Sequence, residues 1–328
     1  MNTLMPVSNL SRMGATGHTV QSGHVETAKN VAAIYNQAGD DYVAYADGDP
    51  TKLFTFDGLH AYADRQIWAL LERKLSALRA SGANSVRFLD AGCGPGTWLR
   101  RLVTRARELG FARISARGFD IAQAQVQRAR LLSRNLSSLA GVNFTFDVAD
   151  LRDCLPESDA SVDLTLCLYS VLSHLPVASL TEVAREISRV TSGYFITTVR
   201  PIGSTPTAFV GSIENARQLV QDHDRDRCEI EFCDHRRIAF SFHLFTASEL
   251  RGYFESDLEI EDLRGLDLFH SRFTPDSRWN PIGLRVDCRL SDQLAQLEGA
   301  FATDPEFIDR GAHLLLLARG RGAAAQAE

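Results

Sequence analysis

Five short apolar runs alternate with stretches of helical periodicity in the middle of the chain. The runs are predicted strands at residues 86–90, 114–120, 142–150, 161–170 and 193–201. Between them, apolar residues recur three or four positions apart, as expected of amphipathic helices. This alternation is typical of a doubly wound, mostly parallel α/β sheet, in which ligands bind beyond the carboxyl ends of the strands.

Further elements are predicted on both sides of this core. Before it we expect one helix that begins at Glu26 and a longer one over residues 58–82, ended by Gly82. After Pro201 the sequence predicts a helix at 212–222, a hairpin at 229–243, a helix capped by Thr246 or Ser248, strands at 257–266 and 282–290, a helix capped by Ser291, and a closing strand at 313–320. The alternating strand at 282–290 could pair across a homodimer.

These elements suggest one large domain with additions. The expected divisions are a disordered leader at 1–24, an N-terminal helical cap at 25–82, a main domain at 83–320 with insertions at about 203–243 and 265–312, and a disordered tail at 321–328.

Composition narrows the classes of protein that fit. The 328 residues carry 35 basic and 41 acidic side chains, a net charge of −6, which argues against a nucleic-acid partner. Residues 1–25 lack the apolar segment expected of a secretory signal, and the apolar run at 314–317 is far too short to span a bilayer. The six scattered cysteines are therefore expected to be reduced, buried thiols of a cytoplasmic protein with no membrane partner.

The glycine-rich stretch DAGCGPGTW, residues 90–98, follows the first predicted strand. A phosphate-binding loop would need Lys followed by Ser or Thr after the last glycine, where Thr97 and Trp98 stand instead. A dinucleotide-binding turn would need its third glycine one residue later, so NAD is disfavoured without being excluded. The Asp90 carboxylate favours a ligand with a cationic amino group, such as the methionine part of S-adenosylmethionine.

FLDAGCGPGTWL resembles the first motif of class I S-adenosylmethionine-dependent methyltransferases. Later motifs follow in order: GFDIAQAQVQRAR, FDVADLRDCLP and SVDLTLCLYSVLSHLP, then the last helix and two closing strands. The resemblance runs from about residue 28 to 319. One departure is visible: the family often has a turn with two glycines before the fifth strand, where TSGYFIT has a single glycine. It implies a seven-stranded, Rossmann-like sheet with N-terminal helices and two inserted segments that form a substrate lid.

The resemblance also implies which residues bind S-adenosylmethionine and its product S-adenosylhomocysteine. Asp120 would hold the ribose hydroxyls, Asp150 and the Leu151 backbone would meet the adenine, and the end of the fourth strand would line the methionine and the reacting methyl. The full set of implied residues is Asp90, Gly92, Cys93, Gly94, Gly96, Asp120, Ile121, Asp150, Leu151 and Leu168. Three of its acids, spaced 30 residues apart, each end a predicted strand.

Direct methyl displacement requires alignment and, for a protic acceptor, a group that takes a proton. His174, just after the fourth predicted strand, is the candidate base, although it could simply pack or cap the next helix. Tyr35, a second candidate catalytic residue, and Tyr42, a candidate substrate contact, come from the N-terminal segment. They could shape the pocket or touch the methionine carboxylate; simple amphipathic packing is the alternative.

The turn-rich segment 269–281 is the candidate substrate lid, although it could also be a surface loop anchored by its aromatic rings. Its candidate substrate contacts are His270, Arg272, Arg278 and Trp279. The two arginines would favour an acidic acceptor. No metal is expected, because the Cys and His spacings within 223–235 do not suit zinc.

The sequence thus predicts an enzyme that methylates a small molecule on oxygen, nitrogen or carbon, in specialised metabolism. The motif NPPY, typical of methylation of amino groups on nucleic-acid bases, is replaced by CLYS after the fourth strand. The alternatives are a protein methyltransferase, a non-methylating member of the same fold, and a binding module with a degenerate site.

Overall fold

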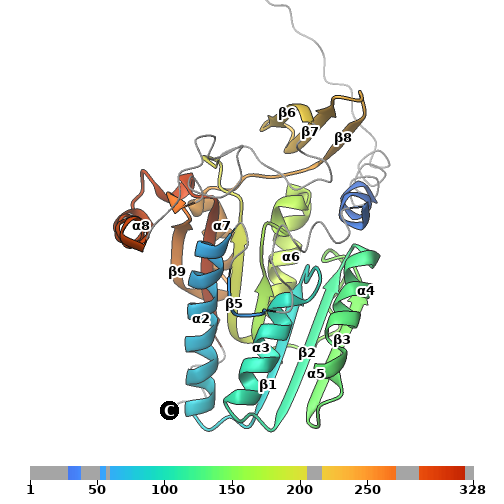
Figure 1. Ribbon diagram of the computed structural model, residues 1–328, viewed down its shortest axis with the longest axis vertical. Coiled ribbons are helices and arrows are strands. Elements are labelled where there is room, and N and C mark those ends of the chain that lie inside the picture. Colours follow the sequence, from blue (N-terminus) through green and yellow to red (C-terminus); the bar gives the residue numbers. More distant parts are fainter. Residues whose placement is uncertain (1–28, 38–51, 57–59, 205–215, 271–287, 322–328) are drawn as a thin grey trace, which may run out of the picture.

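A seven-stranded sheet forms the centre of the computed structural model, which describes residues 29–37, 52–56, 60–204, 216–270 and 288–321 (Figure 1). Its strands are β1 (Ser85–Ala91), β2 (Arg113–Asp120), β3 (Val142–Val148), β4 (Val162–Cys167), β5 (Thr191–Val199), β9 (Leu258–Leu266) and β10 (His313–Gly320). The strand order is β3-β2-β1-β4-β5-β10-β9. β10 pairs antiparallel with β5 and with β9, and all other neighbouring strands of this sheet pair in parallel.

Helices cover both faces of this sheet (Figure 1). Those described are α1 (29–37), α2 (Ala61–Ala80), α3 (Thr97–Glu108), α4 (Gln123–Leu132), α5 (Arg134–Ser137), α6 (Val177–Val190), α7 (Ala247–Phe254) and α8 (Cys288–Phe301), with short 3-10 turns at Leu172–His174 and Ile308–Arg310. Apolar residues of α2, α3 and α4 pack in one core layer, and those of α6 and α7 in the other. The apolar runs and helical periodicities of the sequence therefore predicted the three-layer architecture correctly.

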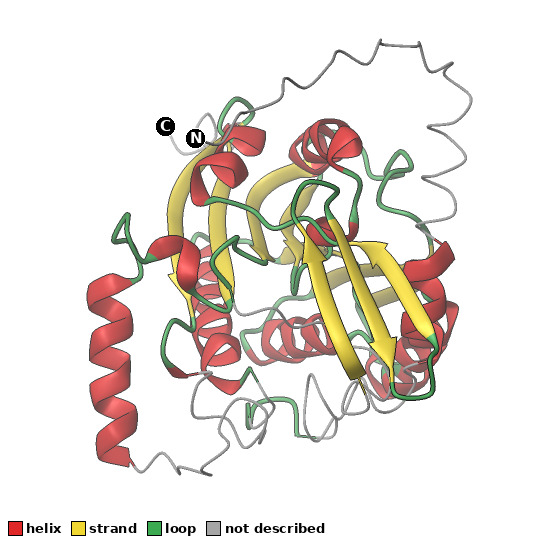
Figure 2. Ribbon diagram, turned by 90° about the horizontal axis from the view of Figure 1, so that it is seen from above, coloured by secondary structure: helices red, strands yellow, loops and turns green. Residues whose placement is uncertain are grey.

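A second, three-stranded sheet lies above the carboxyl ends of the main strands (Figure 2). It consists of β6 (Ala216–Asp222), β7 (Arg227–Phe232) and β8 (Arg237–Ser241). Its apolar face, including Phe232 and Phe242, packs with Val31 of α1 in a separate small core. The helix α1 therefore packs against an insertion that comes almost 200 residues later in the chain.

The prediction of a helix at 212–222 is wrong for residues 216–222, the part of it that the structure describes. Residues 216–222 form β6, paired antiparallel with β7. The edge of β7 offers backbone hydrogen bonds to this segment, and Leu219 packs against the small core, so tertiary pairing overrides local propensity. The predicted hairpin is confirmed, with its turn at residues 233–236.

The strand predicted at 282–290 is wrong at its end. Residues 288–290 already belong to α8, so Ser291 lies inside that helix and does not cap it. Leu290 and Leu294 are one helical turn apart, which extends the apolar stripe of the helix toward its N-terminus. Residues 282–287, and with them most of the proposed dimer strand, lie outside the described residues.

The cysteines only partly match the expectation of buried thiols. Cys93, Cys167 and Cys228 are buried, whereas Cys154 and Cys233 are exposed, and all five are free thiols. The two exposed residues lie in a loop after β3 and in the hairpin turn, where the backbone runs over the surface. Among the described helices, none combines the length and the apolar character needed to cross a bilayer.

Candidate active site

A cleft opens where β1 and β4 lie side by side. The chain leaves β1 toward β2 and β3 on one side and reaches β4 and β5 on the other, which makes this the topological switch point of the sheet. The cleft is lined by Val31, Tyr35, Gly92, Gly94, Phe119, Asp120, Ile121, Gln125, Ala149, Asp150, Leu151, Arg152, Leu168, Tyr169, Val171, His174, Leu175 and Pro176. These residues come from α1, from the end of β2 and from the segments that follow β1, β2, β3 and β4.

The glycine turn after β1 has a backbone conformation that residues with a Cβ atom rarely adopt. Gly92, Gly94 and Gly96 all have positive φ, of 79°, 51° and 77°. The amides of Gly92 and Cys93 both donate to the carbonyl of Phe119, which ties the turn to the end of β2. A Cβ on Gly92 would overlap the side chain of Val171, and one on Gly96 would lie 2.7 Å from Phe146.

Gly92→Ala is expected to cost more stability than Gly82→Ala. Both glycines have positive φ, but Gly82 is surrounded by open space, whereas Gly92 faces Val171. Gly82→Ala should lose only the conformational cost of about 1–2 kcal/mol, and Gly92→Ala about 1–3 kcal/mol more from overpacking. Urea denaturation of the two variants measures the difference, and equal losses would contradict the close packing of the turn against Val171.

Asp120 connects the glycine turn to the end of β2. Its Oδ2 accepts a hydrogen bond from the amide of Gly94 at 2.9 Å, and its Oδ1 accepts one from the amide of Ala122 at 2.8 Å. Burial raises the pKa of Asp120, and these backbone hydrogen bonds partly offset that effect. Each carboxylate oxygen keeps a further acceptor position, so the group can still receive hydroxyl donors from a ligand.

Asp90 is a buried carboxyl at the end of β1, with 2% of its surface exposed. Among the described residues, its Oδ2 has no hydrogen-bond partner. Burial raises the pKa of Asp90 to about 8, and the nearby Asp120 contributes to the shift. A cationic group beside Asp90 would provide the missing partner and favour its ionised form.

Asp150 lies two residues beyond the end of β3, not at the strand end that the sequence predicted. Its Oδ2 pairs with Nη2 of Arg152 at 2.6 Å. Burial opposes ionisation, but the hydrogen bonds from Arg152 outweigh it and lower the pKa of Asp150. The third acid is therefore ionised at neutral pH and shares one wall of the cleft with the guanidinium that holds it.

Tyr35 and His174 meet across the mouth of the cleft. The Tyr35 hydroxyl lies 3.0 Å from Nε2 of His174, and the two rings meet edge to face. Phe240 and Phe242 of the small sheet pack against the same imidazole. Burial lowers the pKa of His174 to about 4, so its ring is neutral at physiological pH.

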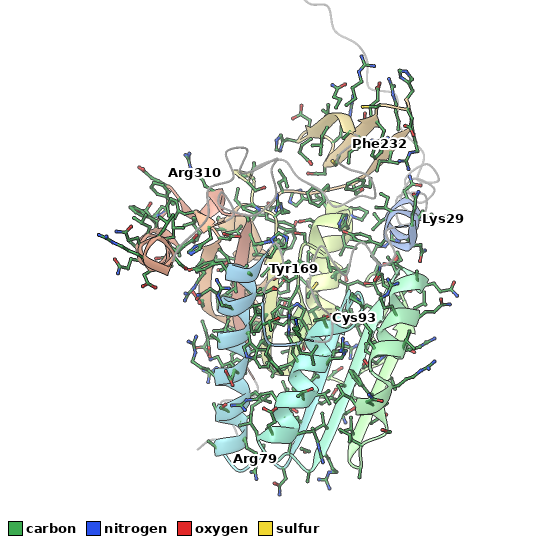
Figure 3. All side chains as sticks on the ribbon, in the orientation of Figure 1. Lys29, Arg79, Cys93, Tyr169, Phe232 and Arg310 are labelled. Carbon is green, nitrogen blue, oxygen red and sulfur yellow. The ribbon has the colours of Figure 1, made fainter. Side chains whose placement is uncertain are left out.

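The turn after β4 is strained at two consecutive residues. Tyr169 and Ser170 have φ of 56° and 68°, values that bulky side chains rarely adopt. Thr198 of β5 holds the turn in place: its Oγ1 accepts from the amide of Tyr169 at 2.7 Å and its carbonyl from that of Ser170 at 2.9 Å. Strain of this kind persists where the surrounding structure fixes it, and it is common at functional sites. Figure 3 places Tyr169 and Cys93 near the carboxyl ends of the strands, below the small sheet.

The structure brings most of the predicted cofactor residues to this cleft. Three of them do not line it: Asp90, Gly96 and Cys93, whose side chain is 6% exposed and packs in the core. Four candidate substrate residues lie outside the described residues, namely Tyr42, Arg272, Arg278 and Trp279. His270 is described and lies elsewhere, stacked on Tyr62 of α2 with ring centroids 3.9 Å apart.

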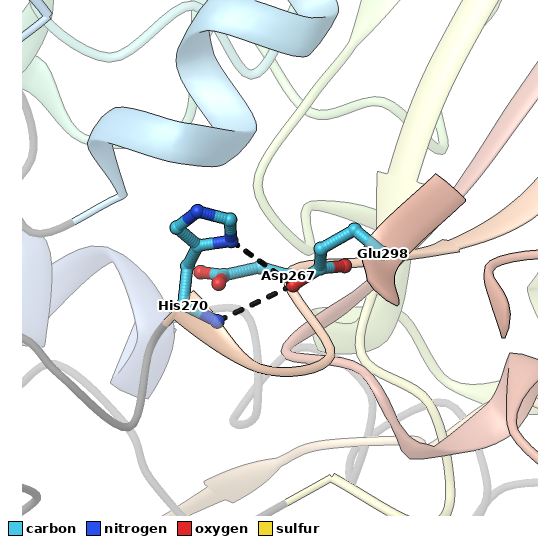
Figure 4. Close-up of side chains that lie close together, drawn as sticks. All are labelled: Asp267, His270 and Glu298. Atoms are coloured by element: carbon cyan, nitrogen blue, oxygen red, sulfur yellow. Dashed lines mark hydrogen bonds and ion pairs between the residues drawn. The ribbon is translucent and has the colours of Figure 1, made fainter. Parts of the chain in front are cut away.

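His270 belongs to a group with Asp267 and Glu298 whose ligand-type atoms all lie within 4.8 Å (Figure 4). The Glu298 carboxylate accepts hydrogen bonds from the amides of residues 268, 269 and 270, at 2.9, 2.7 and 3.3 Å. It also lies 3.3 Å from Nδ1 of His270. Because its acceptor positions face these donors, Glu298 fixes the segment after β9 against α8.

Several residues of the cleft were not predicted from the sequence. Val31 and Gln125 line it from α1 and α4, and Arg152 follows Asp150 by two positions. The acid–x–Arg spacing in DLR is a local signal from which the ion pair could have been predicted. Nothing in the local sequence indicates that Tyr169 lies at a strained turn.

The strand order, the glycine turn and the buried acids behind it define the fold of class I S-adenosylmethionine-dependent methyltransferases. Residues 88–193 match a family model described as a methyltransferase domain. The match covers roughly a third of the chain, and a methyltransferase domain of that class implies S-adenosylmethionine as its cofactor. The residues present fit that ligand, because Asp90 has a buried carboxylate oxygen without a hydrogen-bond partner among the described residues, and Asp120 in the cleft lining keeps acceptor positions for hydroxyl donors.

One solved structure with a TM-score above 0.5 has the same fold. The (4+2)-cyclase SpnF is 18% identical, with a TM-score of 0.52, over 90% of this chain and 97% of that one. Magnesium protoporphyrin IX methyltransferase (ChlM) from Synechocystis PCC 6803, crystallised with bound S-adenosylmethionine, is 15% identical, with a TM-score of 0.47, over 90% and 97%. No curated protein shows significant sequence similarity to the chain.

Proposed function

We propose that this protein transfers a methyl group from S-adenosylmethionine to oxygen, nitrogen or carbon of a small molecule in specialised metabolism. The observation that carries the proposal is the cleft at the switch point, where Asp120 and the glycine turn face a ligand and the unpartnered carboxyl of Asp90 lies directly behind them. When bound, S-adenosylmethionine supplies a methyl group already activated on a sulfonium.

The roles of the cleft residues follow from their chemistry. Asp120 accepts the two ribose hydroxyls, Asp150 and the Leu151 amide receive the adenine, and Asp90 balances the charge of the amino group. The amides of the glycine turn, which open α3, favour the ligand carboxylate. Tyr35 and His174 close the mouth of the cleft and exclude water.

The cover over the cleft favours a small acceptor. Val31 and Tyr35 of α1 line the cleft, and α1 packs against the three-stranded sheet above it. A protein substrate would need an open groove to bring a side chain to the methyl group, and α1 stands across the mouth of this cleft. A buried pocket that encloses most of its ligand is typical of sites for small molecules.

A non-methylating reaction is the second candidate. SpnF shares the fold and is named as a cyclase, so the fold by itself leaves the reaction open. In that case the bound sulfonium would act through its charge or its position, and it would be recovered unchanged. Protein methylation is the third candidate.

Formation of S-adenosylhomocysteine separates these candidates. A metabolite extract is divided by filtration into small molecules and macromolecules, and each fraction is incubated with the protein and S-adenosylmethionine. We expect S-adenosylhomocysteine to form with the small-molecule fraction. Formation only with the macromolecules would support a protein acceptor, and no formation with either fraction despite binding would support the non-methylating reaction.

Tyr35→Phe is expected to weaken binding of S-adenosylhomocysteine about fivefold, the value of one hydrogen bond of about 1 kcal/mol. The variant removes the hydroxyl that contacts Nε2 of His174 and so loosens α1 over the cleft. Tyr253→Phe in α7, which does not line the cleft, is the matched control. Calorimetric titration measures both variants, and equal affinities would contradict the closing role of the Tyr35–His174 contact.

A further inference from the structure

A second group of polar aromatic side chains lies beyond Tyr169, at the edge of the main sheet. His60 is the residue before α2, and His313 is the first residue of β10. The ring of Tyr169 stacks on His60 at 5.5 Å and meets His313 edge to face at 5.3 Å, and the two imidazoles are 5.0 Å apart. We call these three residues the histidine–tyrosine cluster.

His313 is buried, with 3% of its surface exposed. Both of its ring nitrogens are enclosed, and among the described residues neither has a hydrogen-bond partner. Native structures leave few buried polar groups in this state, because each costs free energy that a partner would recover. The unpartnered imidazole therefore points to a ligand group that completes it.

The backbone around His313 is held firmly. The Ala312 carbonyl accepts a hydrogen bond from Nη1 of Arg200 at 3.0 Å, and the Ala312 amide donates to the Asp267 carbonyl at 3.0 Å. His313 itself pairs with Leu266 of β9. A side chain on such a fixed strand end is held with the precision that catalysis requires.

Tyr169 joins the cluster to the cofactor cleft. It lines the cleft together with Gly92 and Leu168, and its ring contacts both histidines. Its hydroxyl donates to Asp64, a buried residue of α2. Because Tyr169 lines the cleft and contacts both histidines, the cluster lies next to the cofactor cleft.

We propose that the histidine–tyrosine cluster is the acceptor site and that His313 takes the proton of the acceptor hydroxyl. This inference rests on the proposed methyl transfer and adds the acceptor class and the proton acceptor. The acceptor is a neutral, planar hydroxyl compound, a phenol or an enol.

The proton and charge balance of the step is simple. The acceptor O–H bond breaks, its proton goes to a ring nitrogen of His313, and an oxygen lone pair forms the new bond to the methyl carbon. The C–S electron pair remains on sulfur, so one positive charge leaves the sulfonium and one appears on the imidazole. The net charge of the site is therefore unchanged by the step. Burial lowers the pKa of His313 well below its ordinary value, so the ring is neutral before the step.

The walls of the site favour a flat, uncharged acceptor. Trp98 lies next to Tyr169, with ring centroids 6.3 Å apart, and adds a further aromatic surface to the cluster. Aromatic rings gain from stacking and edge contacts with another ring. A carboxylate acceptor has no proton to lose and would not require an unpartnered imidazole, whereas a phenol or an enol would.

Binding of a probe phenol tests this proposal without turnover. We titrate 4-nitrophenol into the full-length protein saturated with S-adenosylhomocysteine, by calorimetry. The expected result is that His313→Leu weakens binding of the phenol at least about tenfold, through loss of one buried hydrogen bond, and leaves the affinity for S-adenosylhomocysteine within about twofold. His235→Gln, at a histidine whose side chain is 77% exposed, is the control.

Stability provides an independent readout. His313→Leu replaces an unpartnered buried ring with an apolar side chain, so the melting temperature of the ligand-free protein should rise by about 2 °C or more. A gain in stability together with a loss of phenol binding marks a residue kept for function. If the leucine variant does not fold, His313→Gln tests the same binding loss with a polar side chain.

The outcomes separate this proposal from the proposed function. If the wild-type protein fails to bind S-adenosylhomocysteine, the proposed function fails. If it binds S-adenosylhomocysteine but His313→Leu and His313→Gln bind 4-nitrophenol as the wild type does, or the wild type does not bind the phenol, only the present inference is overturned. Equal loss of both ligands would also overturn it, because His313 would then act on the cofactor cleft as a whole.

Discussion

Asp120→Ala is expected to weaken binding of S-adenosylhomocysteine by about a hundredfold or more. The variant removes the carboxylate that faces the cleft and the acceptor of the Gly94 and Ala122 amides. Hydrogen bonds to charged groups contribute about 1.5–3 kcal/mol each, so the loss of two ribose contacts accounts for at least two orders of magnitude. Calorimetric titration measures the change directly.

Asp147→Ala is the matched control for this result. Asp147 belongs to β3 and pairs with Arg117 on the surface, with 49% of its side chain exposed. Its removal should change the affinity less than about twofold, since surface ion pairs contribute little. An Asp120→Ala protein that remains folded and binds as tightly as the control would contradict the assignment of the ribose site.

Asp90→Asn is expected to stabilise the ligand-free protein increasingly as the pH rises from about 4 to about 8. The pKa of Asp90 is about 8 in the folded protein against an ordinary value of 3.8. Between these values the folded state holds a proton that the unfolded state has released, so the free energy of unfolding of the wild type falls as pH rises. Asn cannot ionise and escapes this loss, which is on the order of several kcal/mol when the pH has passed 8.

The same substitution should weaken S-adenosylmethionine binding about tenfold, because Asn cannot balance the amino group of the ligand. Wild-type binding near neutral pH should release a proton from Asp90, and Asp90→Asn should not. Urea denaturation at about pH 5 and pH 9, with calorimetry in two buffers of different ionisation enthalpy, measures both effects. Parallel stability profiles for the two proteins, with equal proton release, would show that Asp90 is not the titrating group.

The sequence predicted the main sheet well because its central strands are buried on both faces and read as continuous apolar runs. Edge elements were harder. The partly buried strand at 216–222 has three apolar residues among polar ones, and its partner β7 decides its conformation. The glycine turn was predictable because positive φ at three positions requires glycine, and sequence shows glycine directly.

The histidine–tyrosine cluster could not be predicted in the same way. Its members come from residues 60, 169 and 313, and no local pattern links them. Only the strand order β4-β5-β10 places the start of β10 beside the end of β5 and near the turn after β4. The sequence did indicate His174 as the candidate base, because this residue follows the fourth predicted strand. The structure shows it between Tyr35 and two phenylalanines, an arrangement that suits closure of the cleft; its role as a base stays a prediction.

Tracing an isotope-labelled methyl group tests directly whether the protein transfers methyl groups to a small molecule. The protein is incubated with S-adenosylmethionine labelled in its methyl group and with the small-molecule fraction of an extract, and the products are analysed by mass spectrometry. We expect the label to appear in one small compound, together with an equal amount of S-adenosylhomocysteine. The Asp120→Ala variant should form neither. A new product without label, with S-adenosylmethionine recovered intact, would contradict methyl transfer.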